Sequence, residues 1–308
     1  MNEKKFNDYN TFLRNKFGVK VYKISLDAGF TCPNIDGNIG VGGCIYCNNK
    51  SFSPAARQGL KTLDEQISAG MEIGKKMKAK KFIAYFQANT NTYSSVENLK
   101  KIYEKPLEYP DIVGISIGTR PDCVNEEKIA LLESLAKKTF VSIEYGVQTA
   151  NNETLKYINR GHTFEAFLEA VKITKNRNIH ICAHVMLGFP GETRSEMLDM
   201  ANKMNKSGID SIKIHNLIIT KDTELENIYI KKPFHVFDYE EYIELVCEFL
   251  EILSPLIVIE RVCASAPSEY VIAPDWTKSP AKITDDITEM LKSRESYQGK
   301  IFYMNSFI

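Results

Sequence analysis

The sequence has no long apolar run and no leader that would direct it out of the cell. None of its 308 residues belongs to a stretch approaching the ~18–20 apolar residues that a membrane helix requires. Residues 1–18 lack the apolar centre of a secretory signal. We therefore expect a cytoplasmic protein that has no membrane partner and whose thiols stay reduced.

The sequence also lacks an excess of charge of either sign, because its 39 lysines and arginines match its 39 aspartates and glutamates. Total charge therefore neither favours nor excludes a nucleic-acid partner. Basic residues are nevertheless concentrated in the run 75–81 and in the first 25 residues. The N-terminal group consists of Lys4, Lys5, Arg14, Lys16, Lys20 and Lys23. A solvated face is the simpler explanation for such runs, and contact with RNA is the alternative.

No internal repeat is present, but strand-like and helix-like segments alternate along the chain. Runs of β-branched and aromatic residues occupy 20–25, 81–87, 111–117, 140–147, 179–187 and 210–217. Helical patterns lie near 62–78, 95–105, 124–137, 163–176 and 192–206. Thr62 with Glu65, and Thr193 with Glu196, form capping boxes at two of the helix starts. Six strand–helix units predict a parallel sheet, either closed or open.

Three consecutive strands each carry one polar and one apolar face. The residues that alternation places on the polar faces are Ser142, Glu144, Gly146, Gln148, His180, Cys182, His184, Met186, Lys213 and His215. A parallel sheet covered by helices on both faces should instead have nearly continuous apolar strands. We therefore predict an α/β fold, an incomplete TIM-like (β/α)6 barrel with a ligand in its lumen. Its functional loops are expected at the carboxyl ends of the strands.

The chain is expected to have three parts. Residues 1–18 form a helix that flanks the barrel, 19–218 form the barrel, and 219–308 form a C-terminal α/β extension packed on it. Within the extension, 238–253 is an amphipathic helix, 256–261 favours a further strand, and a last helix lies near 284–294. Trp276 lies near Lys278 and Lys282, a combination that suits stacking on RNA bases beside cations.

Three of the seven cysteines, Cys32, Cys44 and Cys47, lie within sixteen residues, directly after the first strand. The loop that carries them is rich in glycine, which lets a backbone wrap around a bulky inorganic group. Thiolates are the usual ligands of iron–sulfur clusters. A structural zinc site needs four ligands, and the next candidates are Cys123 and His162. A redox pair would leave Cys32 idle. Three thiolates thus favour a cubane with one open iron, with zinc, a redox pair and unrelated buried cysteines as the alternatives.

Four further motifs accompany these cysteines. They are Thr119-Arg-Pro-Asp122, Glu144-Tyr-Gly-Val-Gln148, Asn159-Arg-Gly-His-Thr163 and His184-Val-Met-Leu-Gly-Phe-Pro-Gly191. With them, residues 18–220 resemble the radical S-adenosylmethionine (SAM) superfamily, and in particular the radical SAM module of the Elongator catalytic subunit, which also has a long first cysteine gap. The chain is similar to a compact bacterial group of this superfamily. Gram-positive members of that group are linked to converting the 5-carboxymethylaminomethyl-2-thiouridine side chain of the tRNA wobble uridine.

The resemblance implies a [4Fe–4S] cluster held by Cys32, Cys44 and Cys47, whose fourth iron binds SAM and cleaves it to a 5′-deoxyadenosyl radical. The residues that it implies as SAM contacts are Tyr46, Gln87, Asn89, Thr119, Glu144, Gln148, Arg160, His184 and Gly188. Tyr46 stacks near adenine, Arg160 pairs with the SAM carboxylate, and Gly188 belongs to the segment that brackets adenine. The glycines that usually follow the second strand are absent, so Gln87 and Asn89 are weaker candidates.

The resemblance further implies a tRNA substrate and an electron donor such as flavodoxin or ferredoxin. Nothing in 256–308 resembles an acetyltransferase, so no acetyl-CoA domain is expected, and a reaction on an existing uridine side chain fits better. One alternative is a radical SAM enzyme that acts on a small molecule or peptide. The other is a non-catalytic iron–sulfur or zinc module that binds RNA. Cys263 and the lumen histidines are further candidates for a catalytic role.

Overall fold

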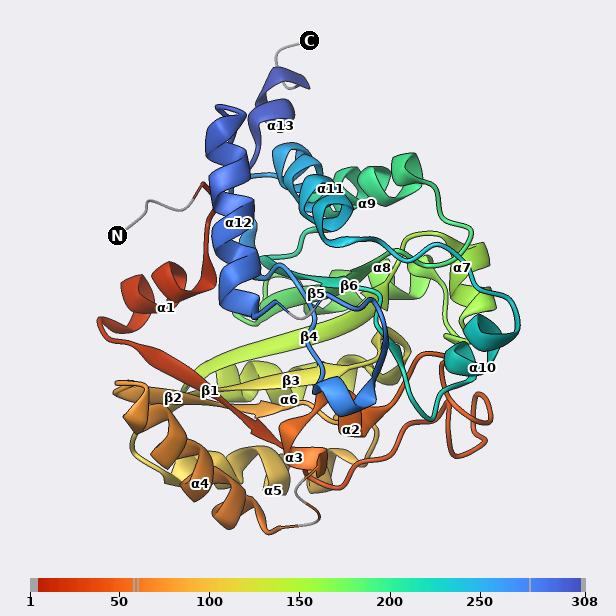
Figure 1. Cartoon of the computed structure of the whole chain (residues 1–308). Helices are drawn as coiled ribbons and strands as arrows, with labels where there is room; N and C mark the ends of the chain where they lie inside the picture. The colour runs from red at the N-terminus through yellow and green to blue at the C-terminus, as the bar shows by residue number, and fades with distance from the viewer. Residues whose placement is uncertain (1–4, 58, 60, 277, 306–308) are drawn as a thin grey trace.

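A curled sheet of seven parallel strands forms the centre of the molecule (Figure 1). The computed structural model describes residues 5–57, 59, 61–276 and 278–305. In spatial order the strands are β1 (Val21–Leu26), β2 (Lys81–Phe86), β3 (Ile112–Thr119), β4 (Phe140–Gln148), β5 (His180–Leu187), β6 (Ser211–Asn216) and β8 (Val258–Arg261). Since β1 and β8 are the two edges and are not paired with each other, the barrel is incomplete, which confirms the predicted fold class.

Helices cover the outer face of this sheet (Figure 1). In chain order, the helices of the described residues are α1 (Tyr9–Phe17), α2 (Asn49–Phe52), α3 (Pro54–Arg57), α4 (Leu63–Lys76), α5 (Val96–Glu104), α6 (Glu126–Ala136), α7 (Asn152–Tyr157), α8 (Phe164–Thr174), α9 (Arg194–Ser207), α10 (Glu224–Lys231), α11 (Tyr239–Ile252), α12 (Pro280–Ser293) and α13 (Lys300–Asn305). Both predicted capping boxes are present, at Thr62 on α4 and Thr193 on α9. The outward residues of β4, such as Ile143 and Tyr145, are fully buried under these helices.

The seventh strand, β8, comes from the C-terminal extension and corrects the expected number of six. It pairs in parallel with β6, whose edge would otherwise present unpaired backbone groups. The run 256–261 is short, and periodicity alone does not say whether so short an apolar run joins a sheet. Elsewhere in the extension, β7 (Ile219–Thr220) and β9 (Val271–Ala273) form a small antiparallel sheet.

Helix α1 lies between the two edges of the open barrel. Asp8, its N-cap, forms a bridge with Ile259 of β8, and the Ile259 amide donates to the Asn7 carbonyl at 2.8 Å. The same helix contacts β1, so it covers one end of the gap between the edge strands. Across the described ranges, no helix is long and apolar enough to span a membrane.

Candidate functional site

The cysteine loop, residues 27–48, connects β1 to α2 and is shaped by its own backbone hydrogen bonds. The Ile35 amide donates to the Cys32 carbonyl at 2.8 Å, and the Cys47 amide donates to the Cys44 carbonyl at 3.0 Å. Gly43 adopts a positive φ of 79°, and a Cβ there would lie 3.1 Å from the Ile35 side chain. The glycines of the loop therefore provide the tight wrapping that the sequence predicts.

Asn34 and Asn159 join the cysteine loop to the turn after α7. The Asn34 amide nitrogen donates to the Asn159 carbonyl at 2.6 Å and lies 3.6 Å from the Cys44 sulfur. The Asn159 side chain donates in return to the Gly43 carbonyl at 2.7 Å. This reciprocal pair brings the Asn159–Thr163 motif, which lies far away in the sequence, directly against the cysteines.

The C-terminal extension holds the other side of the loop. The Leu225 amide, in the first turn of α10, donates to the Ile45 carbonyl at 2.8 Å, and the Asn48 side chain donates to the Lys221 carbonyl at 2.9 Å. Figure 1 shows the loop beside α10. The cysteines are thus positioned by three segments that only the fold brings together.

Arg160 places a buried positive charge beside Cys44. Its Nη1 lies 3.4 Å from the Cys44 sulfur, and its Nη2 donates to the Gly146 carbonyl at 2.6 Å. A Cβ at Gly146 would lie 2.7 Å from that Nη2, so the glycine makes room for the guanidinium. Arg120, held in a bidentate pair by Asp122 (2.9 and 2.7 Å), donates to the Arg160 carbonyl at 2.8 Å. Three of the sequence motifs therefore meet at the cysteines.

The three cysteine side chains of the loop differ in their exposure. Cys44 is buried, Cys32 is half-buried and Cys47 is exposed. Within the described part of the chain, no three His, Cys, Asp or Glu side chains are grouped as ligands of one metal ion. A zinc site gathers its donors around one ion, whereas each thiolate on a cubane binds a different iron.

Unsatisfied buried polar atoms surround the cysteine loop. Among the described residues, Asn34 Oδ1, Arg160 Nε and His162 Nε2 have no hydrogen-bond partner, and His215 Nε2 in the lumen has none either. Buried polar groups are rarely left unpaired, so each needs an explanation. A polar group bound between the cysteines and the lumen would supply the missing partners.

The two segments expected near adenine lie together. The rings of Tyr46 and Phe189 pack with their centroids 5.6 Å apart. Gly188, just before Phe189, has a φ of 103°, which an L side chain rarely adopts. Gln148 and Thr119 lie at the carboxyl ends of β4 and β3, and the Thr119 hydroxyl is 2.6 Å from that of Thr92.

Gln87 and Asn89 make contacts that fasten the polypeptide around the cysteine loop. Gln87 accepts from the Ser25 hydroxyl at 2.8 Å and donates to the Phe52 carbonyl at 3.1 Å. Asn89 donates to the Phe30 carbonyl at 2.8 Å and accepts from the Asn49 side chain at 2.6 Å. These side chains join the strand before the loop to the helix after it, and their contact with SAM stays a prediction.

Deeper in the lumen, five charged or imidazole side chains form what we call the lumen ion cluster: Lys23, Glu144, His184, Lys213 and Glu260. Glu144 accepts from Lys23 at 2.7 Å, from His184 at 2.7 Å and from Lys213. The Ser116 hydroxyl donates to it as well, at 2.5 Å. Glu260 accepts from Lys23 at 2.7 Å and from the Ser211 hydroxyl at 2.9 Å. Two cations therefore balance two carboxylates.

Burial and the neighbouring charges together shift the pKa values of the side chains in the lumen ion cluster. Burial by itself raises the pKa of Glu144, but Lys213 and Lys23 outweigh it and hold that pKa well below its usual range. Burial, together with Lys213, lowers the pKa of His184, so its imidazole is neutral and donates to Glu144. A carboxylate has about four acceptor positions. Four donors, from Lys23, Ser116, His184 and Lys213, already occupy the acceptor positions of Glu144. The structure therefore gives no support to the predicted contact between Glu144 and SAM.

The sequence patterns misplaced two residues and missed one. Lys23 is not part of a solvated basic face, because its side chain turns into the lumen between two carboxylates. Trp276 is not free to stack on bases, because it donates to the Phe237 carbonyl at 3.0 Å and stacks on Tyr242 at 5.6 Å. The sequence patterns did not indicate Glu260 as a residue of the site. They indicated only that residues 256–261 favour a strand. The alternation of polar Lys23 and Ser25 in the first strand was a usable signal for the lumen face.

The fold and site define a class of protein, and comparison with known families identifies it. The family model "Radical SAM superfamily" matches residues 35–204, and "Radical_SAM C-terminal domain" matches 209–293. The chain belongs to the radical SAM superfamily. Its cofactors are accordingly a [4Fe–4S] cluster and SAM. Within that superfamily it is similar to Elongator-type proteins, as the more distant matches below show.

Relatives of similar length come from an archaeon and a bacterium. An uncharacterized protein of Methanocaldococcus jannaschii and the uncharacterized protein YtqA of Bacillus subtilis are each 37% identical to this chain. Each match covers 97% of this chain, and they cover 92% and 94% of the relatives.

Two more distant matches are also archaeal proteins. The tRNA uridine(34) acetyltransferase of M. jannaschii is 28% identical over 186 residues, covering 58% of this chain and 33% of that protein. Among solved structures, archaeal Elp3 of Methanocaldococcus infernus has the same fold, with a TM-score of 0.70 at 19% identity. That match covers 93% of this chain and 68% of the other.

Proposed function

We propose that this protein is a radical SAM enzyme that modifies tRNA at the C5 side chain of the wobble uridine. The radical SAM part of the proposal is carried by one arrangement: a buried arginine, Arg160, beside a three-cysteine loop at the mouth of a polar lumen. The substrate is supported by the similarity of the chain to a protein named tRNA uridine(34) acetyltransferase. Conversion of 5-carboxymethylaminomethyl-2-thiouridine toward the aminomethyl form is the particular reaction proposed.

In this proposal Cys32, Cys44 and Cys47 hold three irons of the cluster. A reduced cluster held by these thiolates would supply the electron for cleavage of SAM, and hence the hydrogen abstraction from the substrate. Arg160 stabilises thiolate charge at Cys44, and its unpartnered Nε is available for the SAM carboxylate. Tyr46 and Gly188 border the adenine, and Gln148 and Thr119 face the rest of SAM from the ends of their strands.

The surrounding residues keep the site dry and ordered. The Tyr46–Phe189 contact and the bonds of Asn34 with Asn159 close the loop over the strand ends. Excluding water matters because a carbon radical would otherwise be lost to side reactions. An electron donor such as reduced flavodoxin or ferredoxin delivers the electron, and the exposed Cys47 marks the side of the loop nearest solvent.

The chemistry is tested by anaerobic reconstitution with iron and sulfide, followed by reduction in the presence of SAM. We expect a 4Fe–4S spectrum and formation of 5′-deoxyadenosine. Absence of both would refute the enzymatic proposal and favour a non-catalytic RNA-binding module.

The substrate is tested separately, by nucleoside mass spectrometry of tRNA from a strain that lacks the protein. We expect 5-carboxymethylaminomethyl-2-thiouridine to accumulate at the wobble position. An unchanged wobble uridine profile, with 5′-deoxyadenosine still formed by the purified protein, would point to a small-molecule or peptide substrate.

A further inference from the structure

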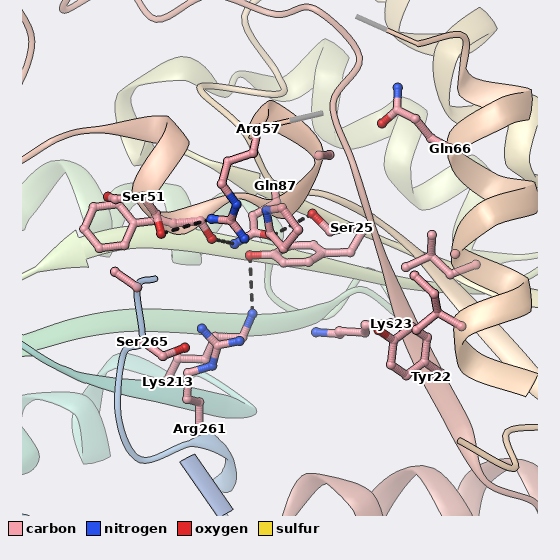
Figure 2. A pocket seen from close by; sticks show the side chains of 18 of the residues that line it. Tyr22, Lys23, Ser25, Ser51, Arg57, Gln66, Gln87, Lys213, Arg261 and Ser265 are labelled. Atoms are coloured by element: carbon pink, nitrogen blue, oxygen red, sulfur yellow. Dashed lines mark hydrogen bonds between the residues drawn. The ribbon is translucent and has the colours of Figure 1, made fainter. Parts of the chain in front are cut away.

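A cavity of about 590 Å³ opens at the side of the barrel, where the edge strands β1 and β8 face each other across the gap. Figure 2 shows its lining, in which Arg57, Lys213 and Arg261 extend toward the same space from α3, β6 and β8. The Tyr85 hydroxyl lies among them and accepts from Lys213 at 3.4 Å. Three members of the lumen ion cluster, Lys23, Lys213 and Glu260, thus line the cavity together with the two arginines.

A β-bulge explains why the lumen edge of β8 carries two charged residues in succession. Ile212 of β6 pairs with Ile259, but the next residue, Lys213, pairs with Arg261, so Glu260 is the extra residue of the bulge. A bulge re-aims side chains that strict alternation would point to opposite faces. Glu260 therefore reaches Lys23, while Arg261 also lines the cavity.

The charges on the cavity wall do not cancel. Lys23 and Lys213 are matched by Glu144 and Glu260. Arg57 donates only to the backbone carbonyls of Lys50 and Ser51, at 2.9 and 3.3 Å. The backbone of Arg261 pairs with β6, but its side chain forms none of the ion pairs or hydrogen bonds found in the described part of the chain. The cavity is left with the positive charge of two guanidinium groups.

We propose that this cavity binds an oxyanion of the substrate, a carboxylate or a phosphate, between Arg261 and Arg57. The inference rests on the proposed function, because it assigns the place at which that substrate is recognised. A guanidinium presents a planar fork of N–H donors that matches a carboxylate or phosphate oxygen pair. Arg261 has all of these donors free, and the Ser265 hydroxyl, on the cavity wall beside it, adds a further donor.

The carboxylate of a modified uridine and a backbone phosphate of the same tRNA are the two sources of such an oxyanion. They are distinguished by comparing tRNA that carries 5-carboxymethylaminomethyl-2-thiouridine with the unmodified transcript of the same tRNA. Binding of each to the reconstituted full-length protein is measured by fluorescence anisotropy. A base carboxylate predicts that wild type prefers the modified tRNA, and a phosphate predicts equal affinities.

Arg261→Gln tests the site itself. We expect it to weaken binding about tenfold, the cost of one charge-assisted hydrogen-bonded contact. The affinity of Arg261→Lys should lie between those of wild type and Arg261→Gln, because lysine keeps the positive charge but lacks the planar pair of N–H donors. Under the carboxylate source the loss is confined to modified tRNA, and under the phosphate source it is the same for both. Thermal stability should be unchanged, since Arg261 makes no contact that folding needs.

Arg294→Gln is the matched control. This arginine, the C-cap of α12, pairs with Glu244 at 3.5 Å and does not line the cavity, so the same loss of charge should leave binding unchanged. Equal binding by wild type and Arg261→Gln overturns the inference while leaving the proposed function intact. Failure of wild type itself to bind either tRNA, with 5′-deoxyadenosine still formed, overturns the substrate proposal instead.

Discussion

The cysteine loop and the lumen ion cluster lie at the same open barrel and are built in opposite ways. The loop gathers its three thiols within sixteen residues and is shaped by uncharged hydrogen bonds, from its own backbone and from the asparagines that tie it to its neighbours. The lumen ion cluster takes one residue from each of five strands, and its Lys23–Glu260 pair joins positions 237 apart in the chain. A local loop can lose its ligand and keep its fold, whereas a network of buried charges is part of what holds the strands in place.

That difference predicts separate effects of mutation on activity and on stability. Changes in the cysteine loop should remove the cofactor with little loss of folding free energy. Changes in the lumen ion cluster should lower folding free energy, because a buried charge without its partner is costly. Four experiments probe this contrast.

The largest effect is expected for replacement of any one of Cys32, Cys44 and Cys47 by alanine. Without a thiolate ligand we expect loss of the 4Fe–4S absorbance and no detectable 5′-deoxyadenosine, with the circular dichroism melting curve nearly unchanged. Cys247→Ala is the control, since Cys247 is buried in α11 and away from the loop. A variant that lost any one of the three thiols and still bound its full complement of iron would exclude that cysteine as a ligand.

Glu144→Gln should have the next largest effect, and on stability. It leaves Lys213 and Lys23 buried with Glu260 as their one remaining carboxylate partner in the cluster. Removing one partner of a buried ion pair lowers the free energy of unfolding by about 3–5 kcal/mol. We expect this loss to appear as a lower midpoint of urea unfolding. Adding Lys213→Met should recover part of that loss, because the second change removes an unpaired charge. If Glu144→Gln had the same urea midpoint as wild type, the lumen ion cluster would not support folding, and the proposed contrast with the cysteine loop would be wrong.

Arg160→Gln should act on the cysteine loop more weakly than the loss of a thiol. It removes the cation 3.4 Å from the Cys44 sulfur, and a hydrogen bond to a charged group contributes about 1.5–3 kcal/mol. We expect the reconstituted protein to bind iron but to release it to a chelator about tenfold faster. Arg194→Gln, which breaks an exposed pair with Glu248, is the control. Equal release rates would remove Arg160 from the site.

The smallest effect is expected in the pH dependence of stability. The pKa of Glu144 is lowered in the folded protein, so its contribution is fully present above the ordinary carboxyl range near 4.5 and is lost as pH falls below it. The urea midpoint of wild type should therefore drop more between pH 6 and pH 4 than that of Glu144→Gln. Glu127→Gln, at an exposed position of α6, should follow wild type. Parallel curves for wild type and Glu144→Gln would contradict the assigned charge.

Strand alternation predicted much of the lumen. It placed Glu144, His184 and Lys213 on one face, and the structure joins these three by hydrogen bonds. The cysteine spacing and the glycine-rich loop are local features, and the superfamily that they indicated is confirmed. The capping boxes of α4 and α9 were equally readable, because a capping box is complete within four residues.

Other features had no local signature. Lys23 lay in a basic N-terminal segment, and its position among the other lysines suggested a solvated face, with contact with RNA as the alternative. Its partner Glu260 lies on β8, where a bulge interrupts the two-residue period of the strand. Alternation therefore predicts the wrong face of the sheet for Arg261, the residue after Glu260. Trp276 beside two lysines resembled a stacking platform, yet two tyrosines and a backbone carbonyl already hold it.

The sequence by itself therefore determined the first six strands of the sheet, the longer helices between them, the polar face of the lumen and the position of the three cysteines. Each of these depends on a local pattern: the two-residue alternation of a strand, the four residues of a capping box, or the sixteen residues that contain the cysteines. Such patterns are short enough to be recognised from neighbouring residues in the sequence. Tertiary structure alone decided that the C-terminal extension completes the sheet with β8 and that Lys23 pairs with Glu144 and Glu260. The physical reason is curvature: only when the sheet curls do β1 and β8 approach, and a lysine on one edge then reaches a carboxylate on the other.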